Sequence, residues 1–307
     1  MNTKFYEIDI NNINAEKMQE AGDLIAAGEL VAFPTETVYG LGGDGLKEDV
    51  AEKIYRAKGR PSDNPLILHI TELSALEVLA VDIPKLAYRL AEKFWPGPLT
   101  MILKKSTIVP YAVTGGLDTV AIRMPSDEIA REIIKASGTY IAAPSANSSS
   151  RPSPTKAEHV IEDLFGKIDM IVDGGASDIG LESSIIDLSG EVPMILRPGF
   201  ITKEDFEEIV AKVEYDKAVL AKKVQESVVA KAPGMKYRHY APKGSLTIVA
   251  GPTDEVVDYI NAACEAAGYA GKRTGVLCTS ETAARYQADC IKCVGTRADE
   301  GTVAHSL

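Results

Sequence analysis

Residues 30–45 of this chain are Leu30-Val-Ala-Phe-Pro-Thr-Glu-Thr-Val-Tyr-Gly-Leu-Gly-Gly-Asp-Gly45. The apolar beginning predicts a strand over residues 30–34, and the segments 16–29 and 47–57 predict a helix on either side of it. A strand between two helices is typical of an α/β protein. Polar residues 34–39 follow the end of the strand, where α/β proteins bind their ligands. We therefore expect a ligand-facing loop that continues into glycine turns.

Gly40, Gly42 and Gly45 match the spacing of the dinucleotide-binding fingerprint, but their position does not fit it. That fingerprint has its first glycine at the exit of the strand, whereas residues 34–39 intervene here. The sequence also contains no G-x-x-x-x-G-K-[S/T], which excludes a P-loop as a motif.

The same alternation of strands and helices continues to about residue 210. Further helices are predicted at 84–94, 127–136, 154–165 and 203–213. Further strands are predicted at 66–70, 99–103, 120–124, 140–143, 170–172, 185–188 and 194–196. Some neighbouring strands have no helix between them, so we expect a twisted mixed sheet rather than a purely parallel one. These elements define a first domain over residues 1–212.

A connector and a smaller domain are predicted after residue 212. Within residues 213–243, the part from 231 onward holds four Lys/Arg, one His and two Pro, and no acid. Residues 244–307 predict a Rossmann-like βαβαβ unit, with strands at 246–249, 275–278 and 290–294, a helix at 255–267 and a short helix near Ala283. A domain of about 65 residues is marginal, and it stops as another helical pattern begins, so we expect the natural chain to continue.

Composition describes an ordinary globular protein, with 45% hydrophobic and 25% charged residues among 307. A net charge of −11 argues against binding of nucleic acid over the whole surface of the protein, although the basic connector could supply a local binding patch. No apolar run approaches the roughly 20 residues of a membrane helix. Residues 1–9 lack the basic start and apolar core of a secretory signal, so we expect a cytoplasmic protein.

Four cysteines, all in the last quarter, leave two interpretations open. Cys290-x-x-Cys293 resembles half of a zinc or redox site, but Cys264 and Cys278 do not form a second close couple. We therefore favour small buried cysteines in a reducing compartment.

Cations and hydroxyls recur where predicted strands and helices end. They lie in Lys58-Gly-Arg60, Ser145-Ala-Asn147, Ser183-Ser184, Arg197-Pro-Gly199 and Lys236-Tyr-Arg-His-Tyr240. This set contains no metal-ligand cluster and no nucleophile–His–acid pattern, so it suits recognition of polyphosphate and carboxylate groups better than hydrolysis. A nucleotide-using enzyme is the resulting interpretation.

Each of these positions also has a plainer explanation. Lys58 and Arg60 could merely cap a helix C-terminus. Arg123 near the end of an apolar strand needs a partner, which could be a structural acid or a substrate carboxylate. Residues 143–150 could be a Ser-rich surface loop, and His69 could be structural.

Ordered motifs along the chain resemble those of the YrdC-type threonylcarbamoyl-AMP synthases. The resemblance rests on residues 34–41 and 95–100 together with Lys58-Gly-Arg-Pro61, Ala143-Pro-Ser-Ala-Asn147, Glu182-Ser-Ser184 and Arg197-Pro-Gly199. Residues 1–210 resemble the catalytic domain of that family. Residues 233–242 and the smaller domain resemble its long, two-domain form. Ala232, Ser184 and Ser150 stand where the family usually has Ser, Thr and Gly.

The resemblance implies a nucleotidyltransferase that makes L-threonylcarbamoyl-adenylate and pyrophosphate from L-threonine, bicarbonate and ATP. Mg²⁺ would arrive with ATP, with no protein side chains as its ligands, and no organic cofactor is implied. The product would pass to a transferase that modifies an adenosine in tRNA, with at most weak tRNA contact by this chain and no membrane partner.

The resemblance also implies the residues of the site. Threonine would be bound by Thr35, His69, Arg123, Ala143 and Ser183. ATP would be bound by Lys58, Arg60, Asn64, Thr119, Ser145, Asn147, Ser153, Arg197, Tyr237 and His239. Tyr237 and His239 belong to residues 231–243, which we expect to close over the nucleotide as a lid; a linker that merely docks on the domains is the plainer reading. Two other functions stay open: a carbamoyl-adenylate-forming enzyme, and a non-catalytic RNA-binding module.

Overall fold

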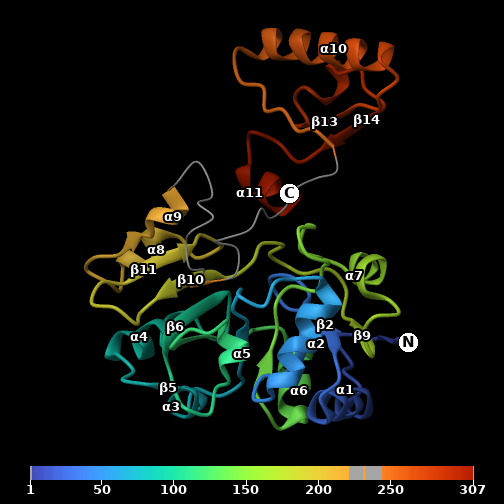
Figure 1. The fold of residues 1–307 in the computed structure, drawn as a ribbon. Coiled ribbons are helices and arrows are strands. Elements are labelled where there is room, and N and C mark those ends of the chain that lie inside the picture. Colours follow the sequence, from blue (N-terminus) through green and yellow to red (C-terminus); the bar gives the residue numbers. More distant parts are fainter. Residues whose placement is uncertain (1, 221–230, 233–243, 307) are drawn as a thin grey trace. The chain divides into compact units, whose positions relative to one another are not determined.

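A computed structural model describes residues 2–220, 231–232 and 244–306. The chain divides into two compact units, Met1–Ala241 and Pro242–Leu307. Figure 1 shows the first unit in blue to yellow and the second in orange to red. The expected boundaries at residues 212 and 243 stay predictions.

One large mixed sheet forms the centre of the first unit, which confirms the expected sheet type. Its strands are ordered β1-β9-β2-β3-β8-β4-β7-β6-β10-β11-β12, with β5 paired to β6. The pairs β1/β9, β2/β9, β4/β7, β6/β10 and β11/β12 are parallel, and the others are antiparallel. The bounds are β1 Lys4–Glu7, β2 Val31–Phe33, β3 Gly40–Asp44, β4 Ile67–His69, β5 Ala80–Val81, β6 Leu99–Lys105, β7 Thr119–Arg123, β8 Ile141–Ala142, β9 Met170–Asp173, β10 Ser184–Asp187, β11 Met194–Arg197 and β12 Glu214–Tyr215.

Helices cover both faces of the sheet around β2. Side chains of a strand alternate between faces, and here Val31 and Phe33 pack in one apolar cluster with α1 and α6. Ala32 points to the other cluster, together with Ile54 of α2. The helices are α1 Ala15–Ala27, α2 Glu48–Lys58, α3 Ala75–Leu79, α4 Lys85–Phe94, α5 Tyr111–Thr114, α6 Glu128–Ser137, α7 Ala157–Leu164, α8 Lys203–Glu207 and α9 Lys217–Leu220.

The predicted helices and strands of this unit are present, with differences at their ends. α7 and α8 are shorter than the expected 154–165 and 203–213. The sequence patterns did not predict the short elements α3, α5, α9, β1, β5 and β12. Elements of two to five residues carry too few turns or alternations to show a period.

The glycine-rich residues 40–44 form strand β3, so the expectation of glycine turns is wrong. β3 pairs antiparallel with β2 and with β8. A side chain is not tolerated here because a Cβ at Gly42 would lie 2.5 Å from Phe33 Cε1 and 2.8 Å from Ile141 Cγ2. The glycines thus let neighbouring core side chains close over the strand backbone.

The described part of the second unit has fewer strands than the predicted βαβαβ pattern, two instead of three. It contains α10 Thr253–Tyr269, β13 Gly275–Cys278, the 3₁₀ turn Ala283–Arg285, β14 Cys290–Cys293 and α11 Glu300–Ser306. β13 and β14 form a two-stranded parallel sheet. Residues 246–249 form no strand, which corrects that expectation: Leu246 is 71% and Ile248 88% exposed, without a pairing strand among the described residues.

The cysteines of this unit also differ from the expectation of burial. Cys278 is buried and Cys264 partly buried, whereas Cys290 and Cys293 are exposed. Across the described part of the chain, no group of three or more His, Cys, Asp or Glu is placed to hold a metal ion. None of the described helices is long and apolar enough to cross a bilayer.

Candidate active site

A row of polar side chains crosses the middle of the large sheet. His69 at the end of β4 is the register partner of Arg123 at the end of β7, and Arg123 is in turn the partner of Thr100 near the start of β6. Directly paired residues of neighbouring strands share a face of the sheet. Ser183 directly precedes β10, and its hydroxyl lies 2.7 Å from the hydroxyl of Thr100. The row therefore extends over four adjacent strands.

The loop that follows β2 lies beside this row and is fixed by its own hydroxyls. Thr35 Oγ1 donates to the carbonyl of Val38 at 2.6 Å and accepts from the backbone N–H groups of Thr37 and Val38. Thr35 and Thr37 hydroxyls are 3.0 Å apart. Threonine is well suited to such a turn because its short hydroxyl reaches the nearby backbone.

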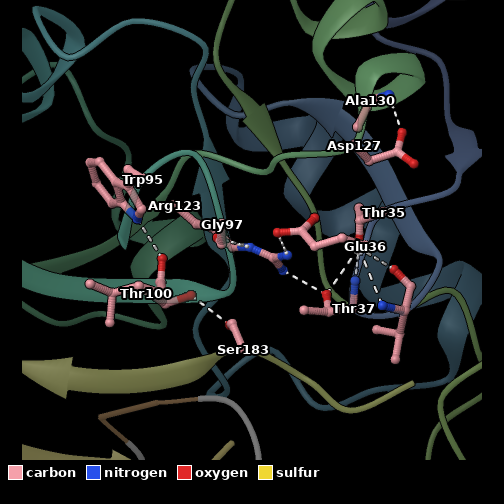
Figure 2. A network of polar contacts seen from close by, with 12 residues as sticks. Thr35, Glu36, Thr37, Trp95, Gly97, Thr100, Arg123, Asp127, Ala130 and Ser183 are labelled. Atoms are coloured by element: carbon pink, nitrogen blue, oxygen red, sulfur yellow. Dashed lines mark hydrogen bonds and ion pairs between the residues drawn. The ribbon is translucent and has the colours of Figure 1, made fainter. Parts of the chain in front are cut away.

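Arg123 is the centre of the polar network in Figure 2. Its Nη1 donates to Thr37 Oγ1 at 2.8 Å, its Nε donates to the carbonyl of Gly97 at 3.4 Å, and its Nη2 lies 2.7 Å from Glu36 Oε1. Arg123 is 4% and Glu36 6% exposed. Burial opposes ionisation of Glu36, but the adjacent guanidinium outweighs it and holds the pKa of this carboxyl below its ordinary value. A structural acid thus partners Arg123 in this structure.

His69 is a neutral imidazole in this environment. Burial and the positive charge of Arg123 lower its pKa to about 4. Its Nδ1 lies 3.1 Å from the carbonyl of Ile67. A neutral ring can donate and accept a hydrogen bond, which suits recognition of a hydroxyl group.

Arg197 contacts Ser183, the residue that also contacts Thr100. Its Nε donates to the Ser183 carbonyl at 2.9 Å, and its Nη2 donates to the Ser183 hydroxyl at 3.0 Å. Thr100 is fully buried, so this chain of contacts runs from the sheet interior to a half-buried cation. Nearby, Ser153 donates to the carboxylate of Glu182.

Lys58 supports the Ala143–Asn147 loop from beneath. Its ammonium donates to the carbonyls of Ser145 and Asn147 and to the side-chain oxygen of Asn147. Burial and the positive charge of Arg60 hold the pKa of Lys58 well below its ordinary value. Its amine holds the loop through three hydrogen bonds in this structure.

An open cavity lies over the polar row. It is lined by all five residues expected to bind threonine, Thr35, His69, Arg123, Ala143 and Ser183. It is also lined by four of those expected to bind ATP, Arg60, Ser145, Ser153 and Arg197. The lining thus includes three guanidinium groups, at Arg60, Arg123 and Arg197.

Four other residues expected at the ATP site do not line the cavity. Lys58 is buried and donates to Asn147, which ends the loop that carries Ser145. Asn64 is buried, and its carbonyl accepts from Tyr55 and Arg60. Thr119 begins β7, whereas Arg123 ends it. The last two expected residues, Tyr237 and His239, lie outside the described residues, as does most of the expected lid.

Sequence reasoning missed several polar members of the site. Thr37 and Glu182 line the cavity, and Glu36 and Thr100 contact residues that do. Glu36 lay within the predicted ligand loop but had no individual signal. Thr100 follows Leu99 in an apolar strand, so only its register partner Arg123 reveals its place.

Fold and cavity together define a class of protein. The mixed α/β sheet gathers cations and hydroxyls along one row of strand ends. Such a row is typical of proteins that bind small molecules with phosphate and carboxylate groups. Comparison with known proteins then gives the family.

This chain belongs to the Sua5/YciO/YrdC family. Residues 23–199 match that family model, described as "Telomere recombination", and residues 201–307 match the "Threonylcarbamoyl-AMP synthase, C-terminal domain". The threonylcarbamoyl-AMP synthase of Pyrococcus abyssi is 49% identical over 284 residues, which are 92% of this chain and 82% of that protein. The Bacillus subtilis enzyme of the same name is 46% identical over 100% of this chain and 88% of that protein.

A solved structure has the same fold over nearly the whole chain. The crystal structure of Pyrococcus abyssi Sua5 complexed with L-threonine superposes with a TM-score of 0.90 at 47% identity and covers 99% of this chain and 86% of that one. The long, two-domain form of the family, expected from the sequence, is thereby confirmed.

Proposed function

We infer that this chain is an enzyme that makes L-threonylcarbamoyl-adenylate from L-threonine, bicarbonate and ATP and releases pyrophosphate. The observation that carries this inference is the cavity over the polar row, in a chain that is 46% identical over its full length to a threonylcarbamoyl-AMP synthase. The reaction needs one pocket for an amino acid next to one for a triphosphate. The lining residues offer three guanidinium groups for this, at Arg60, Arg123 and Arg197.

The amino acid would occupy the end of the cavity at Arg123. A guanidinium binds a carboxylate through paired charge-assisted hydrogen bonds. Thr35 and the neutral His69 would then meet the hydroxyl of threonine, with Ala143 and Ser183 completing the wall. The amine of threonine attacks the carbon derived from bicarbonate, a C–N bond forms, and water leaves.

ATP would occupy the end at Arg60 and Arg197, where Ser145 and Ser153 also lie. An oxygen of the new carbamate attacks the α-phosphorus of ATP, the O–P bond forms, and pyrophosphate departs. Such chemistry depends on positioning and charge neutralisation rather than on a protein nucleophile. Lys58, Asn64, Thr119 and Asn147 remain proposed members of the nucleotide site, and for Lys58 and Asn147 the described contacts favour a role in shaping the loop around Ser145.

Residues 213–243 would connect the domains 1–212 and 244–307, and their basic part would act as a lid. Support comes from Lys231 and Ala232, the two described residues at the start of the expected lid. Ala232 is fully buried in an apolar cluster that also contains Ile67, a lining residue of the cavity. Lys231 pairs with Asp187 of β10 at 3.4 Å. A chain anchored there starts within reach of the nucleotide. Tyr237 and His239 would then exclude water from the reactive anhydride.

Mg²⁺ would reach the site on the triphosphate. Mg²⁺ usually keeps several waters and binds through phosphates and few carboxylates. The lining residues fit this because cations and hydroxyls predominate and the carboxylate of Glu182 is engaged by Ser153. The product would serve a cytoplasmic transferase that modifies an adenosine of tRNA, with no more than weak tRNA contact by this chain.

Pyrophosphate release with each amino acid in turn tests the function. With ATP, Mg²⁺ and ¹⁴C-bicarbonate, threonine should release pyrophosphate and yield a labelled adenylate. An adenylate that forms when ammonium or carbamoyl phosphate replaces the amino acid as the nitrogen source would favour the carbamoyl-adenylate alternative. A stoichiometric RNA complex with steep salt dependence and no ATP turnover would favour the RNA-binding module.

A further inference from the structure

Two of the four cysteines lie opposite each other in the small sheet of the second unit. Cys278 ends β13 and Cys293 ends β14, and they are register partners in this parallel pair of strands, which Figure 1 labels. Hydrogen bonds continue beyond the two cysteines, because the carbonyl of Cys278 accepts from Val294 and the carbonyl of Gly295 accepts from Ser280, both at 2.8 Å. The backbone therefore holds the two cysteines at strand spacing from both sides.

This spacing fits a disulfide. Neighbouring strands are about 4.8 Å apart, and cysteines joined by a disulfide have Cα atoms about 4.4–6.8 Å apart. Register partners also share one face of the sheet. The thiol of Cys278 points toward β14, where its Sγ donates to the carbonyl of Lys292 at 3.9 Å. Both cysteines are free thiols in this structure, and a disulfide could join them without a change of register.

The Cys-x-x-Cys spacing of Cys290 and Cys293 does not form a pair in this fold. The two residues begin and end the same strand. Residues three apart in a strand point to opposite faces and are roughly 10 Å apart, which is too far for a disulfide without backbone movement. The register partner of Cys290 is Gly275, which has no thiol. The structure thus pairs Cys293 with Cys278 rather than with Cys290.

The two paired thiols differ in their access to solvent. Cys293 is exposed, whereas Cys278 is 8% exposed and packs in an apolar cluster with Val257 and Val276. Burial raises the pKa of Cys278, and the neighbouring thiol of Cys293 raises it further. An oxidant in solution therefore meets Cys293 first and finds a second thiol beside it. Redox-sensitive cysteines commonly consist of such an accessible thiol next to a resolving one.

We propose that Cys278 and Cys293 are a modification site, at which a peroxide joins β13 to β14 through a reversible disulfide. The sulfur of Cys293 attacks one oxygen of hydrogen peroxide, the O–O bond breaks, and the thiol proton leaves with the other oxygen as water. The sulfur of Cys278 then attacks the sulfenic acid on Cys293, the S–S bond forms, the S–O bond breaks, and a second water departs with the proton of Cys278. The two thiols are oxidised by two electrons, the peroxide is reduced, and a dithiol reverses the modification by exchange.

Peptide mapping of the full chain tests this pairing. Trypsin places each cysteine in a separate peptide: Cys264 in 244–272, Cys278 in 274–285, Cys290 in 286–292 and Cys293 in 293–297. The chain is oxidised with hydrogen peroxide in dilute solution, remaining thiols are blocked with N-ethylmaleimide, and the monomer band of a non-reducing gel is digested. Mass spectrometry should find 274–285 linked to 293–297 as the main disulfide, and dithiothreitol should remove the link.

Two variants of exposed cysteines in β14 form a matched pair of controls. The link should be lost in Cys293→Ser and should persist in Cys290→Ser. The proposal is overturned if the native chain forms no link, if Cys290–Cys293 or Cys264–Cys278 is the main link, or if C290S also loses it. Oxidation in guanidinium chloride shows the pairing of the unfolded chain. If the link between Cys278 and Cys293 predominates there to the same degree, the strands play no part in it.

The disulfide should also slow local unfolding of the second unit. It closes a loop over residues 279–292, which restricts the unfolded chain. Thermolysin should cleave residues 253–293 at least about tenfold more slowly in the oxidised chain than in the reduced one. Peroxide should leave the cleavage of C293S unchanged. Equal cleavage of the oxidised and reduced native chains would show that the disulfide does not hold the strands together, and would overturn this part of the proposal.

Discussion

Replacing Arg123 by alanine should destabilise the first unit as well as abolish threonine binding. Arg123 is the partner of Glu36, and both are almost completely buried. Removal of one partner of a buried ion pair leaves an uncompensated charge, which costs about 3–5 kcal/mol. For a unit of 150–250 residues, each kcal/mol lowers Tm by about 2–4 °C, so R123A should melt roughly 6–20 °C below the native protein.

The loss of stability should depend on pH, and the direction follows from Glu36. In the native protein, Arg123 holds the pKa of Glu36 below 4.5, so this carboxyl contributes stability above that pH and loses it as pH falls through its lowered pKa. In R123A, burial without the cation raises that pKa, so stability falls as pH rises past 4.5. The gap in Tm between the two proteins should therefore widen from pH 4 to pH 7.

Thermal unfolding at both pH values and calorimetry with each substrate measure these effects. ATP binding should be retained in R123A, since Arg60 and Arg197 are unchanged. The double variant E36Q/R123A, without the buried charge, should recover part of the lost Tm and lose its pH dependence. Native threonine affinity in R123A, or a Tm gap that is the same at pH 4 and pH 7, would refute the reasoning.

Three further outcomes are expected. Arg197→Ala should weaken ATP binding by about 1.5–3 kcal/mol, the value of a charge-assisted contact, as measured by calorimetry; intact binding and turnover would make this strand end structural. Deletion of residues 233–242 should depress adenylate formation far more than threonine affinity, and equal protease cleavage with and without ligands plus full activity in the deletion would reduce the segment to a tether. Gly42→Ala should destabilise the first unit by about 1–3 kcal/mol, because its Cβ meets Phe33 at 2.5 Å, whereas Gly190→Ala, in open space, serves as the control.

Most of the first unit could be predicted because its elements carry clear periods. Apolar runs such as residues 99–103 mark buried strands. Residues 127–136 repeat their apolar positions at helical spacing, and Asp127 caps the helix by accepting a hydrogen bond from the backbone N–H of Ala130. Strand β3 was missed because glycine has no side chain to alternate. Its pairing is decided by Phe33 and Ile141, which lie elsewhere in the sequence.

The error at residues 246–249 has the opposite cause. Leu246 and Ile248 alternate as in a strand, but alternation shows only that a segment suits a sheet, and the described residues offer it no neighbour to pair with. A strand forms only when a second segment pairs with it, and the alternation pattern describes only one of the two segments.

The candidate site was predictable in its cations but not in their partners. Arg123 and Arg197 were recognisable because a charge at the end of an apolar strand is unusual. Whether Arg123 met a protein acid or a ligand could not be decided, since Glu36 and Arg123 are far apart in sequence and meet only through the fold. For the same reason, the burial of Lys58 beneath the Ser145 loop had no sequence signal.

The polar row across β4, β7 and β6 depends on strand alignment. A slip of one residue in either pairing would turn His69 or Thr100 toward the face opposite Arg123. The members of this row are brought into line by the same strand pairing that completes the centre of the sheet. A chain whose central strands have not paired in this register therefore lacks the row, even though it contains every residue of it.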